Sequence, residues 1–203
     1  MNRGAMSTRA RLLVASLALT LLSGCGGGTA EGVEPPLAGA AIGGPFELVD
    51  SEGRTVRWSD FDGRYRMVYF GYAYCPDICP YDVQRMMQGF AAFKQAEPAL
   101  AAQVQPIFIT IDPVRDSPAK VGEFTAAFSD DLLGLTGTAE QVDQAAKAFA
   151  VYYAKGEDAG NESYLMDHSR AGYLMGRRGE PIALLPVEQN AEAVAAELAK
   201  WVS

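Results

Sequence analysis

Residues 66–80 read RMVYFGYAYCPDICP, and this stretch decides the fold. Apart from Arg66, its first seven residues are apolar or aromatic, as expected of a buried central strand. From Pro80 to about Glu97, apolar side chains recur at helical spacing, which predicts a helix that opens on a proline. Cys75 and Cys79 lie between these two elements. The stretch therefore predicts a strand, a turn that carries two thiols, and a helix.

Further predicted elements surround this unit. In chain order they are a hairpin over 46–57, a strand over 104–111, helices over 117–128 and 138–150, a short strand over 151–154, a hairpin over 173–185 and a final helix over 190–202. Alternating strands and helices, closed by an antiparallel hairpin, are typical of an α/β sandwich. With two cysteines between the first long strand and its helix, this order predicts a thioredoxin-like sandwich with an N-terminal β-hairpin extension.

The composition is that of an acidic globular chain. Its 203 residues include 25 Asp+Glu against 17 Lys+Arg, for a formal net charge of −8, and 49% of them are hydrophobic. The apolar fraction is too high for a disordered chain. Nucleic-acid phosphates require surfaces rich in Lys and Arg, and anionic lipid requires a basic patch. We therefore expect no nucleic-acid partner and no electrostatic docking on lipid.

The N-terminus has the pattern of a signal peptide. Arg3, Arg9 and Arg11 precede or border an apolar run of 11 residues over 12–22, and no Asp or Glu occurs in the first 24 residues. A helix that spans a bilayer needs about 20 residues. The short run therefore predicts a secretory signal rather than a transmembrane helix.

Cys25 follows this run directly, in the sequence Leu-Ser-Gly-Cys over 22–25. The sequence looks like a bacterial lipobox, in which the cysteine is lipidated and becomes the mature N-terminus; an ordinary secretory signal with an incidental cysteine is the alternative. Residues 26–44 are rich in Gly, Ala and Pro, as flexible tethers are. The predicted organisation is a lipoprotein signal peptide at 1–24, a lipid-anchored tether at 25–43 and a thioredoxin-like domain at 44–203. We expect this domain outside the cytoplasm, anchored to a bacterial membrane and facing the periplasm.

Cys75 and Cys79 are the two cysteines that remain, and each has only the other to pair with. A disulfide that closes so short a loop contributes little stability, so a chemical role is favoured over a structural bridge. At positions i and i+4 of a helical turn, both sulfurs can face one object. A helix N-terminus also lowers the pKa of a thiol, which favours the thiolate. Two thiolates select Cu(I), zinc or an iron–sulfur cluster.

His168 is the only histidine of the chain. Two cysteines and one histidine are too few for a four-cysteine cluster or a structural zinc site, whereas copper fits two sulfur donors and one nitrogen. We expect His168 in the loop before a strand at Tyr173, beside the helix tip that carries the thiols. Asp167 is a candidate to orient the imidazole from the outer sphere. Asp77 is expected either to tune the charge at the metal or to cap the helix.

Several motifs resemble, in order, those of the Sco/SenC/PrrC family of copper-binding thioredoxin-like proteins. They are VYFGY at 68–72, CPDICP at 75–80, DPVRDSP at 112–118, GLTGT at 134–138 and DHS at 167–169. The resemblance covers about residues 43–202. It implies that Cys75, Cys79 and His168 bind one copper ion per chain, as Cu(I) or Cu(II).

The same resemblance implies a role in building the dinuclear copper centre of cytochrome c oxidase, by metal delivery, by reduction of that site's cysteines, or both. The implied partner is the copper-site subunit of the oxidase, with other copper chaperones or a thioredoxin-like reductant as further candidates. A non-enzymatic metallochaperone is the main interpretation. Cys75 and Cys79 also form the expected redox disulfide, and its formation would release the metal.

An extracytoplasmic thiol–disulfide oxidoreductase is the alternative interpretation. Such proteins resemble one another in a C-x-x-C pair beside a cis-proline, whereas this chain has C-x-x-x-C and no proline between Pro118 and Pro181. Both departures favour metal binding and leave thiol exchange open. A peroxiredoxin-like peroxidase ranks last, because its Pro-x-x-x-Thr-x-x-Cys pattern precedes neither cysteine. For Asp112, Arg115 and Asp116, pinning of a loop is favoured over a catalytic role.

Overall fold

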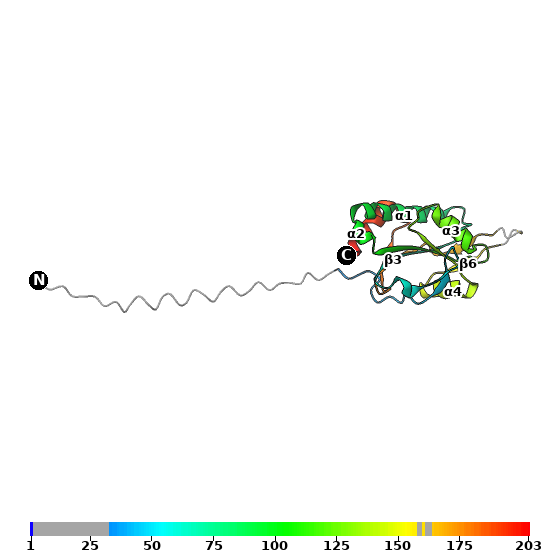
Figure 1. Ribbon diagram of the computed structural model, residues 1–203, viewed down its shortest axis with the longest axis horizontal. Coiled ribbons are helices and arrows are strands. Elements are labelled where there is room, and N and C mark those ends of the chain that lie inside the picture. Colours follow the sequence, from blue (N-terminus) through cyan, green and yellow to red (C-terminus); the bar gives the residue numbers. More distant parts are fainter. Residues whose placement is uncertain (2–32, 158–159, 161–163) are drawn as a thin grey trace. The chain divides into compact units, whose positions relative to one another are not determined.

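The computed structural model describes Met1 and residues 33–157, 160 and 164–203 (Figure 1). Residues 2–24 of the predicted signal peptide, the lipidation site Cys25 and residues 26–32 of the predicted tether lie outside these residues. Glu34–Ser203 form one compact unit, which contains every side chain of the hydrophobic core. Within the described part of the chain, no helix has both the length and the apolar character needed to cross a bilayer.

The described elements match most of the predicted ones. In chain order they are β1 (Glu47–Val49), β2 (Thr55–Arg57), the 3-10 helix η1 (Trp58–Phe61), β3 (Tyr65–Gly71), α1 (Ile78–Ala96), α2 (Pro98–Ala101), β4 (Val104–Thr110), α3 (Pro118–Ala126), β5 (Leu133–Leu135), α4 (Ala139–Ala148), β6 (Tyr153–Lys155), β7 (Met166–His168), β8 (Gly172–Met175), β9 (Pro181–Leu185) and α5 (Ala191–Trp201). Both hairpins, both long strands and the four longer helices are confirmed. The short elements η1, α2, β5 and β7 were not predicted.

Five strands form the central sheet, in the order β5-β4-β3-β8-β9. β3 and β4 are parallel, in a register that runs from Tyr65 opposite Val104 to Gly71 opposite Thr110. β5 continues the parallel core, and β8 and β9 close it as an antiparallel hairpin. The ribbons β1–β2 and β6–β7 are separate two-stranded sheets. This topology confirms the predicted α/β sandwich with its N-terminal hairpin.

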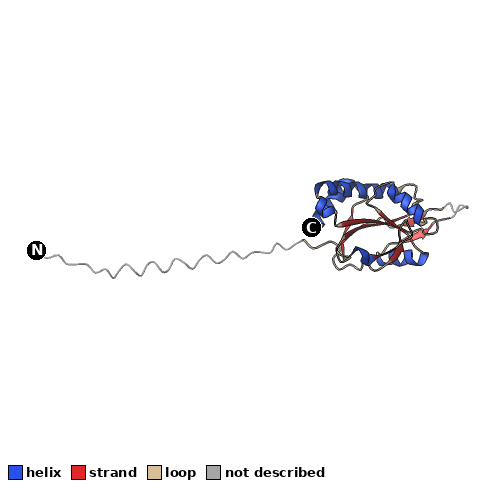
Figure 2. Ribbon diagram, in the orientation of Figure 1, coloured by secondary structure: helices blue, strands red, loops and turns tan. Residues whose placement is uncertain are grey.

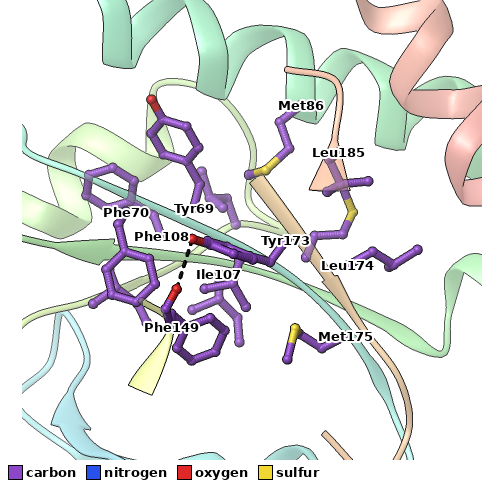
Figure 3. Packing of buried hydrophobic residues seen from close by; sticks show 14 of the residues in the cluster. Tyr69, Phe70, Met86, Ile107, Phe108, Phe149, Tyr173, Leu174, Met175 and Leu185 are labelled. Atoms are coloured by element: carbon purple, nitrogen blue, oxygen red, sulfur yellow. Dashed lines mark hydrogen bonds between the residues drawn. The ribbon is translucent and has the colours of Figure 1, made fainter. Parts of the chain in front are cut away.

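Helices cover both faces of the sheet (Figures 1 and 2). α1, α2 and α3 lie on one face, with α5 packed along α1, and α4 lies on the other face. Buried aromatic rings fill the space between the layers. In Figure 3, the Tyr173 hydroxyl donates a hydrogen bond to the Phe149 carbonyl at 3.0 Å, within this cluster. β3 and β4 are thereby held at the centre of the domain, and the segment with the two cysteines begins where β3 ends.

The helix after the cysteines begins at Ile78, two residues before the predicted start at Pro80. Pro80 therefore occupies the third helical position. The first N–H groups of a helix have no intrahelical acceptor, so a proline there sacrifices no hydrogen bond. As a consequence, Cys79 belongs to the first turn of α1 rather than to the turn before it.

The folded unit also includes residues 34–43, which were predicted to be tether. The Leu37 N–H donates to the Ile182 carbonyl at 3.0 Å, and the Gly43 N–H donates to the Ala148 carbonyl at 2.7 Å. Backbone hydrogen bonds to two separate elements fix this segment on the domain. A Gly- and Pro-rich composition does not distinguish a free tether from a segment that the domain holds in place.

Candidate metal centre

The two thiols lie at the N-terminus of α1. Cys75 is half-buried in the turn after β3, whereas Cys79 has no exposed surface. The Cys79 N–H donates a hydrogen bond to Cys75 Sγ at 3.4 Å. A hydrogen bond to Cys75 Sγ from the side chain of Cys79 is the largest cause that lowers the pKa of Cys75. The i, i+4 spacing thus brings the two cysteine side chains into contact with each other, as predicted.

His168 ends β7, whose backbone pairs with β6 so that His168 lies opposite Tyr153. The Ser169 N–H donates to the Tyr152 carbonyl at 2.9 Å, and the Tyr152 N–H donates to Ser169 Oγ at 3.1 Å. These bonds fix the position of the imidazole, whose Nε2 lies 3.2 Å from Cys79 Sγ. The predicted loop is therefore wrong in secondary structure, because His168 belongs to a strand. The structure nevertheless brings the three predicted donors together.

The imidazole is oriented by a backbone carbonyl. His168 Nδ1 lies 2.9 Å from the Ser169 carbonyl oxygen, which can only accept a hydrogen bond. In the neutral ring, Nδ1 therefore carries the proton and Nε2 presents its lone pair to Cys79 Sγ. The prediction that Asp167 orients the ring is corrected: Asp167 is exposed, and alternation along the strand directs its side chain to the opposite face. The orienting role belongs to Ser169.

The thiol pair shares a single proton. A hydrogen bond donated by the Cys79 thiol is the main cause that lowers the pKa of Cys75, and the backbone N–H groups of Asp77 and Cys79 lower it further. The same bond, together with burial, raises the pKa of Cys79. Because the two groups are coupled, these shifts describe the pair: the first proton leaves readily and the second is retained. The directions of the two shifts favour a state in which Cys75 is the thiolate and Cys79 keeps its proton.

Asp77 occupies the N-cap position of α1. Its side chain is exposed and, within the described part of the chain, it makes no capping hydrogen bond. Its backbone N–H donates to the Cys75 sulfur instead. Neither predicted role of the Asp77 carboxylate corresponds to a contact among the described residues; the residue acts through its main chain.

Two tyrosine rings contact the imidazole edge-on. The ring centroid of Tyr72 lies 6.0 Å from that of His168, at an interplanar angle of 88°, and the Tyr69 centroid lies 6.4 Å away at 90°. Burial and the nearby thiolate of Cys75 raise the pKa of Tyr72 to about 12. The Tyr72 hydroxyl therefore stays protonated at neutral pH, and it donates a hydrogen bond to Cys75. Tyr72 thus stabilises the thiolate form of Cys75.

The loop after β4 is held to the loop that carries the thiols. Oδ2 of the buried Asp116 accepts hydrogen bonds from the Ala73 N–H at 2.8 Å and from the Thr110 hydroxyl at 2.6 Å. Arg115 Nε donates to Asp112 Oδ2 at 2.5 Å. Both acidic residues are engaged in fixing backbone and side chains, which is the loop-pinning role favoured from the sequence.

Asp82 and Arg170 were not among the predicted site residues. Asp82 has no exposed surface and lies one turn after Cys79 on α1. It accepts hydrogen bonds from the Tyr69 hydroxyl at 3.0 Å and from Arg170 Nε and Nη2 at 3.0 and 2.8 Å. An acidic residue among apolar ones on a buried helix face is a signal that could have identified Asp82. No local pattern identifies Arg170, which lies 88 positions away in the chain.

The donor set consists of two sulfurs and one imidazole nitrogen. Among residues 33–157, 160 and 164–203, no three His, Cys, Asp or Glu side chains are already spaced as a metal cage. Cys79 contacts both Cys75 and His168, so an ion would replace these contacts and displace the proton of Cys79. Two thiolates and a neutral imidazole suit a soft ion of low coordination number.

Known proteins are similar to this chain over most of its length. The sequence model of the SCO1/SenC family matches residues 34–203. The mitochondrial SCO2 homolog of Bos taurus is 43% identical over 141 residues, which are 69% of this chain and 52% of the relative. The mitochondrial SCO1 homolog 2 of Arabidopsis thaliana is 36% identical over 181 residues, or 89% of this chain and 63% of the relative. The chain thus spans about half to two thirds of the length of these curated relatives.

Solved structures show the same fold. The structure of Bradyrhizobium japonicum ScoI with copper bound is 32% identical, with a TM-score of 0.71 over 79% of this chain and 99% of that one. Yeast Sco1 with copper bound is 33% identical, with a TM-score of 0.72 over 79% of this chain and 88% of that one. The thioredoxin-like sandwich expected from the sequence is therefore confirmed, and the chain belongs to the SCO1/SenC family.

Proposed function

We propose that this protein is a metallochaperone that binds one copper ion through Cys75, Cys79 and His168 and delivers it during assembly of the dinuclear copper centre of cytochrome c oxidase. The observation that carries the proposal is the imidazole geometry. Nε2 lies 3.2 Å from Cys79 Sγ while Nδ1 is tied to the Ser169 carbonyl. This contact places the free ring nitrogen of the only histidine beside a buried sulfur, which is the arrangement that joint binding of one ion requires. The copper-bound structures of similar proteins support the same ion.

The geometry fits binding followed by release. Copper as Cu(I) supplies a soft centre that prefers thiolates to carboxylates and water. Cys75 is half-exposed and already a thiolate at neutral pH, so it is the donor that meets an incoming ion first. Cys79 gives up the remaining proton as it binds. The exposure of Cys75 also allows ligands of a partner to replace the chain's own donors one at a time.

Reduction of protein thiols is the second candidate, favoured by the direct contact between the two cysteines. In this reaction the Cys75 thiolate attacks a disulfide of the target and forms a mixed disulfide. The Cys79 sulfur then attacks Cys75 Sγ and loses its proton, which leaves a Cys75–Cys79 disulfide and two thiols on the target. The same disulfide occupies both sulfur donors, so copper binding and thiol reduction exclude each other.

We also propose that the domain is anchored outside the cytoplasm. Lipidation of Cys25 after removal of residues 1–24 would leave residues 25–33 as the tether to a folded unit that begins at Glu34. Such a short link would keep the metal centre near the membrane surface. Mass spectrometry of the mature N-terminus tests this proposal, since an unmodified Cys25 in the membrane fraction contradicts it.

The copper proposal is tested by titrating the reduced unit 34–203 with Cu(I) against a competing chelator. We expect one Cu(I) per chain, with affinity lowered by Cys75→Ser, Cys79→Ser and His168→Ala. Asp167→Asn is the matched control, because Asp167 is the exposed neighbour of His168 in the same strand. Unchanged affinity and stoichiometry in His168→Ala would contradict the three-donor site. Fast disulfide exchange without copper binding would instead favour the reductase.

A further inference from the structure

A buried carboxylate lies directly behind the metal centre. Asp82 has no exposed surface, and it lies one turn after Cys79 on the face of α1 that packs against the sheet. A buried charge is costly unless it is paired and hydrogen-bonded. Asp82 meets this condition, because both of its oxygens have partners.

The partner that carries the opposite charge is Arg170, two residues after His168. Its Nε donates to Asp82 Oδ2 at 3.0 Å and its Nη2 donates to Asp82 Oδ1 at 2.8 Å. These two parallel bonds form the bidentate guanidinium–carboxylate geometry, which fixes orientation as well as distance. The pair therefore joins the helix that holds Cys79 to the segment that follows the β6–β7 ribbon and His168.

Tyr69 provides a second link between Asp82 and His168. Its hydroxyl donates to Asp82 Oδ2 at 3.0 Å, and its ring lies edge-on to the imidazole of His168. Asp82 thus contacts one group that packs on the imidazole and another that lies on the same segment as the imidazole. His168 itself belongs to a ribbon outside the main sheet, so its distance from Cys79 depends on contacts of this kind.

We propose that the Asp82–Arg170 pair is a positioning device that holds His168 Nε2 against Cys79 and thereby sets the copper affinity of the site. This inference rests on the proposed copper-binding function. Arg85 provides an internal comparison, since its Nη1 lies 3.7 Å from Asp82 Oδ1. Arg85 belongs to α1 itself, so its contact with Asp82 stays within one helix and cannot position His168. The proposal therefore assigns different effects to two arginines that contact one carboxylate.

The first test needs no copper. Because the chain has a single histidine, its ring protons give one unambiguous set of NMR signals. We expect NOEs between the His168 and Tyr69 rings in the wild-type unit 34–203 and in Arg85→Lys. Arg170→Lys keeps the charge that neutralises Asp82 but cannot make two parallel bonds, so we expect weaker NOEs and a more mobile imidazole. Full NOEs in both Arg170→Lys and Arg170→Gln would overturn the proposal.

The second test measures Cu(I) affinity by chelator competition. Loss of an outer-sphere partner lowers metal affinity by about 10- to 100-fold. We expect a loss near the lower figure for Arg170→Lys, a larger loss for Arg170→Gln, and no loss for Arg85→Lys. Thermal unfolding of each variant confirms that it is folded, and the double variant Asp82→Asn/Arg170→Gln keeps a neutral hydrogen bond should Arg170→Gln fail to fold.

A double-mutant cycle separates positioning from general stability. If the pair acts through His168, Arg170→Gln lowers the affinity of the wild type but adds no further loss in the His168→Ala background. An equal loss in both backgrounds would overturn the proposal. Absence of copper binding in the wild type would refute the proposed function alone, because the NOE comparison would still decide whether the pair positions the imidazole.

Discussion

Gly71 packs against Cys79 of the candidate metal centre, and replacing it by alanine should disturb both the fold and the site. A Cβ atom at this position would lie 3.1 Å from each of three atoms: Cys79 Sγ, Phe108 Cε2 and Tyr69 Cε1. Ordinary van der Waals contacts of such an atom are 3.4–4 Å. All three neighbouring side chains are fully buried, so none can swing into solvent to relieve the clash. Relief requires a shift of the sheet, of α1 or of the sulfur itself.

The magnitude follows from the number of neighbours and their lack of freedom. Overpacking a close-packed core by one methyl group costs about 1–3 kcal/mol. For a domain of this size, each kcal/mol lowers Tm by about 2–4 °C, so Gly71→Ala should lower Tm by about 2–12 °C. Copper affinity should fall as well, because the displaced Cys79 Sγ is a donor.

Gly44→Ala is the matched control for this substitution. A Cβ at Gly44 would lie 3.4 Å from the Ala148 Cβ, an ordinary contact, and its effect should stay within about 1 kcal/mol of the wild type. Calorimetry of the two variants of unit 34–203, followed by Cu(I) competition, decides the matter. If Gly71→Ala melts at or above the temperature of Gly44→Ala, the packing argument is refuted.

Four further predictions concern the thiols and the loop beside them. Because the pKa of Cys75 is lowered, iodoacetamide should modify Cys75 at about pH 6, where a thiol with a pKa of about 8.5 is almost unreactive, and should leave Cys79 intact. Peptide mass spectrometry measures the labelling of each cysteine. Preferential labelling of Cys79 would contradict the assignment of the lower pKa to Cys75. Tyr72→Phe removes a hydrogen bond to the Cys75 thiolate, so the pH profile of this alkylation should shift to higher pH, and an unshifted profile would exclude the bond. Asp116→Ala leaves the half-buried Ala73 N–H and the buried Thr110 hydroxyl without their acceptor and should cost about 1–3 kcal/mol in urea unfolding, a penalty that Asp116→Asn largely avoids. Burial raises the pKa of Asp116 above its ordinary 3.8, so the contribution of Asp116 to stability should fall as the pH rises above 3.8, and the difference between the wild type and Asp116→Asn should show this slope.

The order of elements could be predicted because each long element has its own local signal. Thr138 and Gln141 illustrate this, since the predicted capping box is present with both of its hydrogen bonds. β5, by contrast, has three residues and exists because it continues the parallel register of β4. No period can be recognised in three residues, so such a strand is visible only once its neighbour is placed.

The three candidate donor residues could be predicted from the sequence, whereas the contacts that hold them in position could not. Cys75, Cys79 and His168 carry rare side chains, and their scarcity alone directs attention to them. The contacts that orient them come from a backbone carbonyl at Ser169 and from a pair of residues 88 positions apart in the chain. A carbonyl is present at every residue, and a long-range ion pair leaves no mark in local spacing. These features depend on tertiary structure.

The nitrogen donor and the sulfur donors lie on parts of the molecule with different expected rigidity. Cys79 belongs to a 19-residue helix packed on the sheet, whereas His168 ends a three-residue strand in a peripheral ribbon. Small peripheral elements open locally at free energies far below that of global unfolding. If the proposed site holds copper, we expect local opening of this ribbon, rather than global unfolding, to govern the residence time of the ion. Tight equilibrium binding and rapid cargo exchange are therefore compatible within a single stable domain.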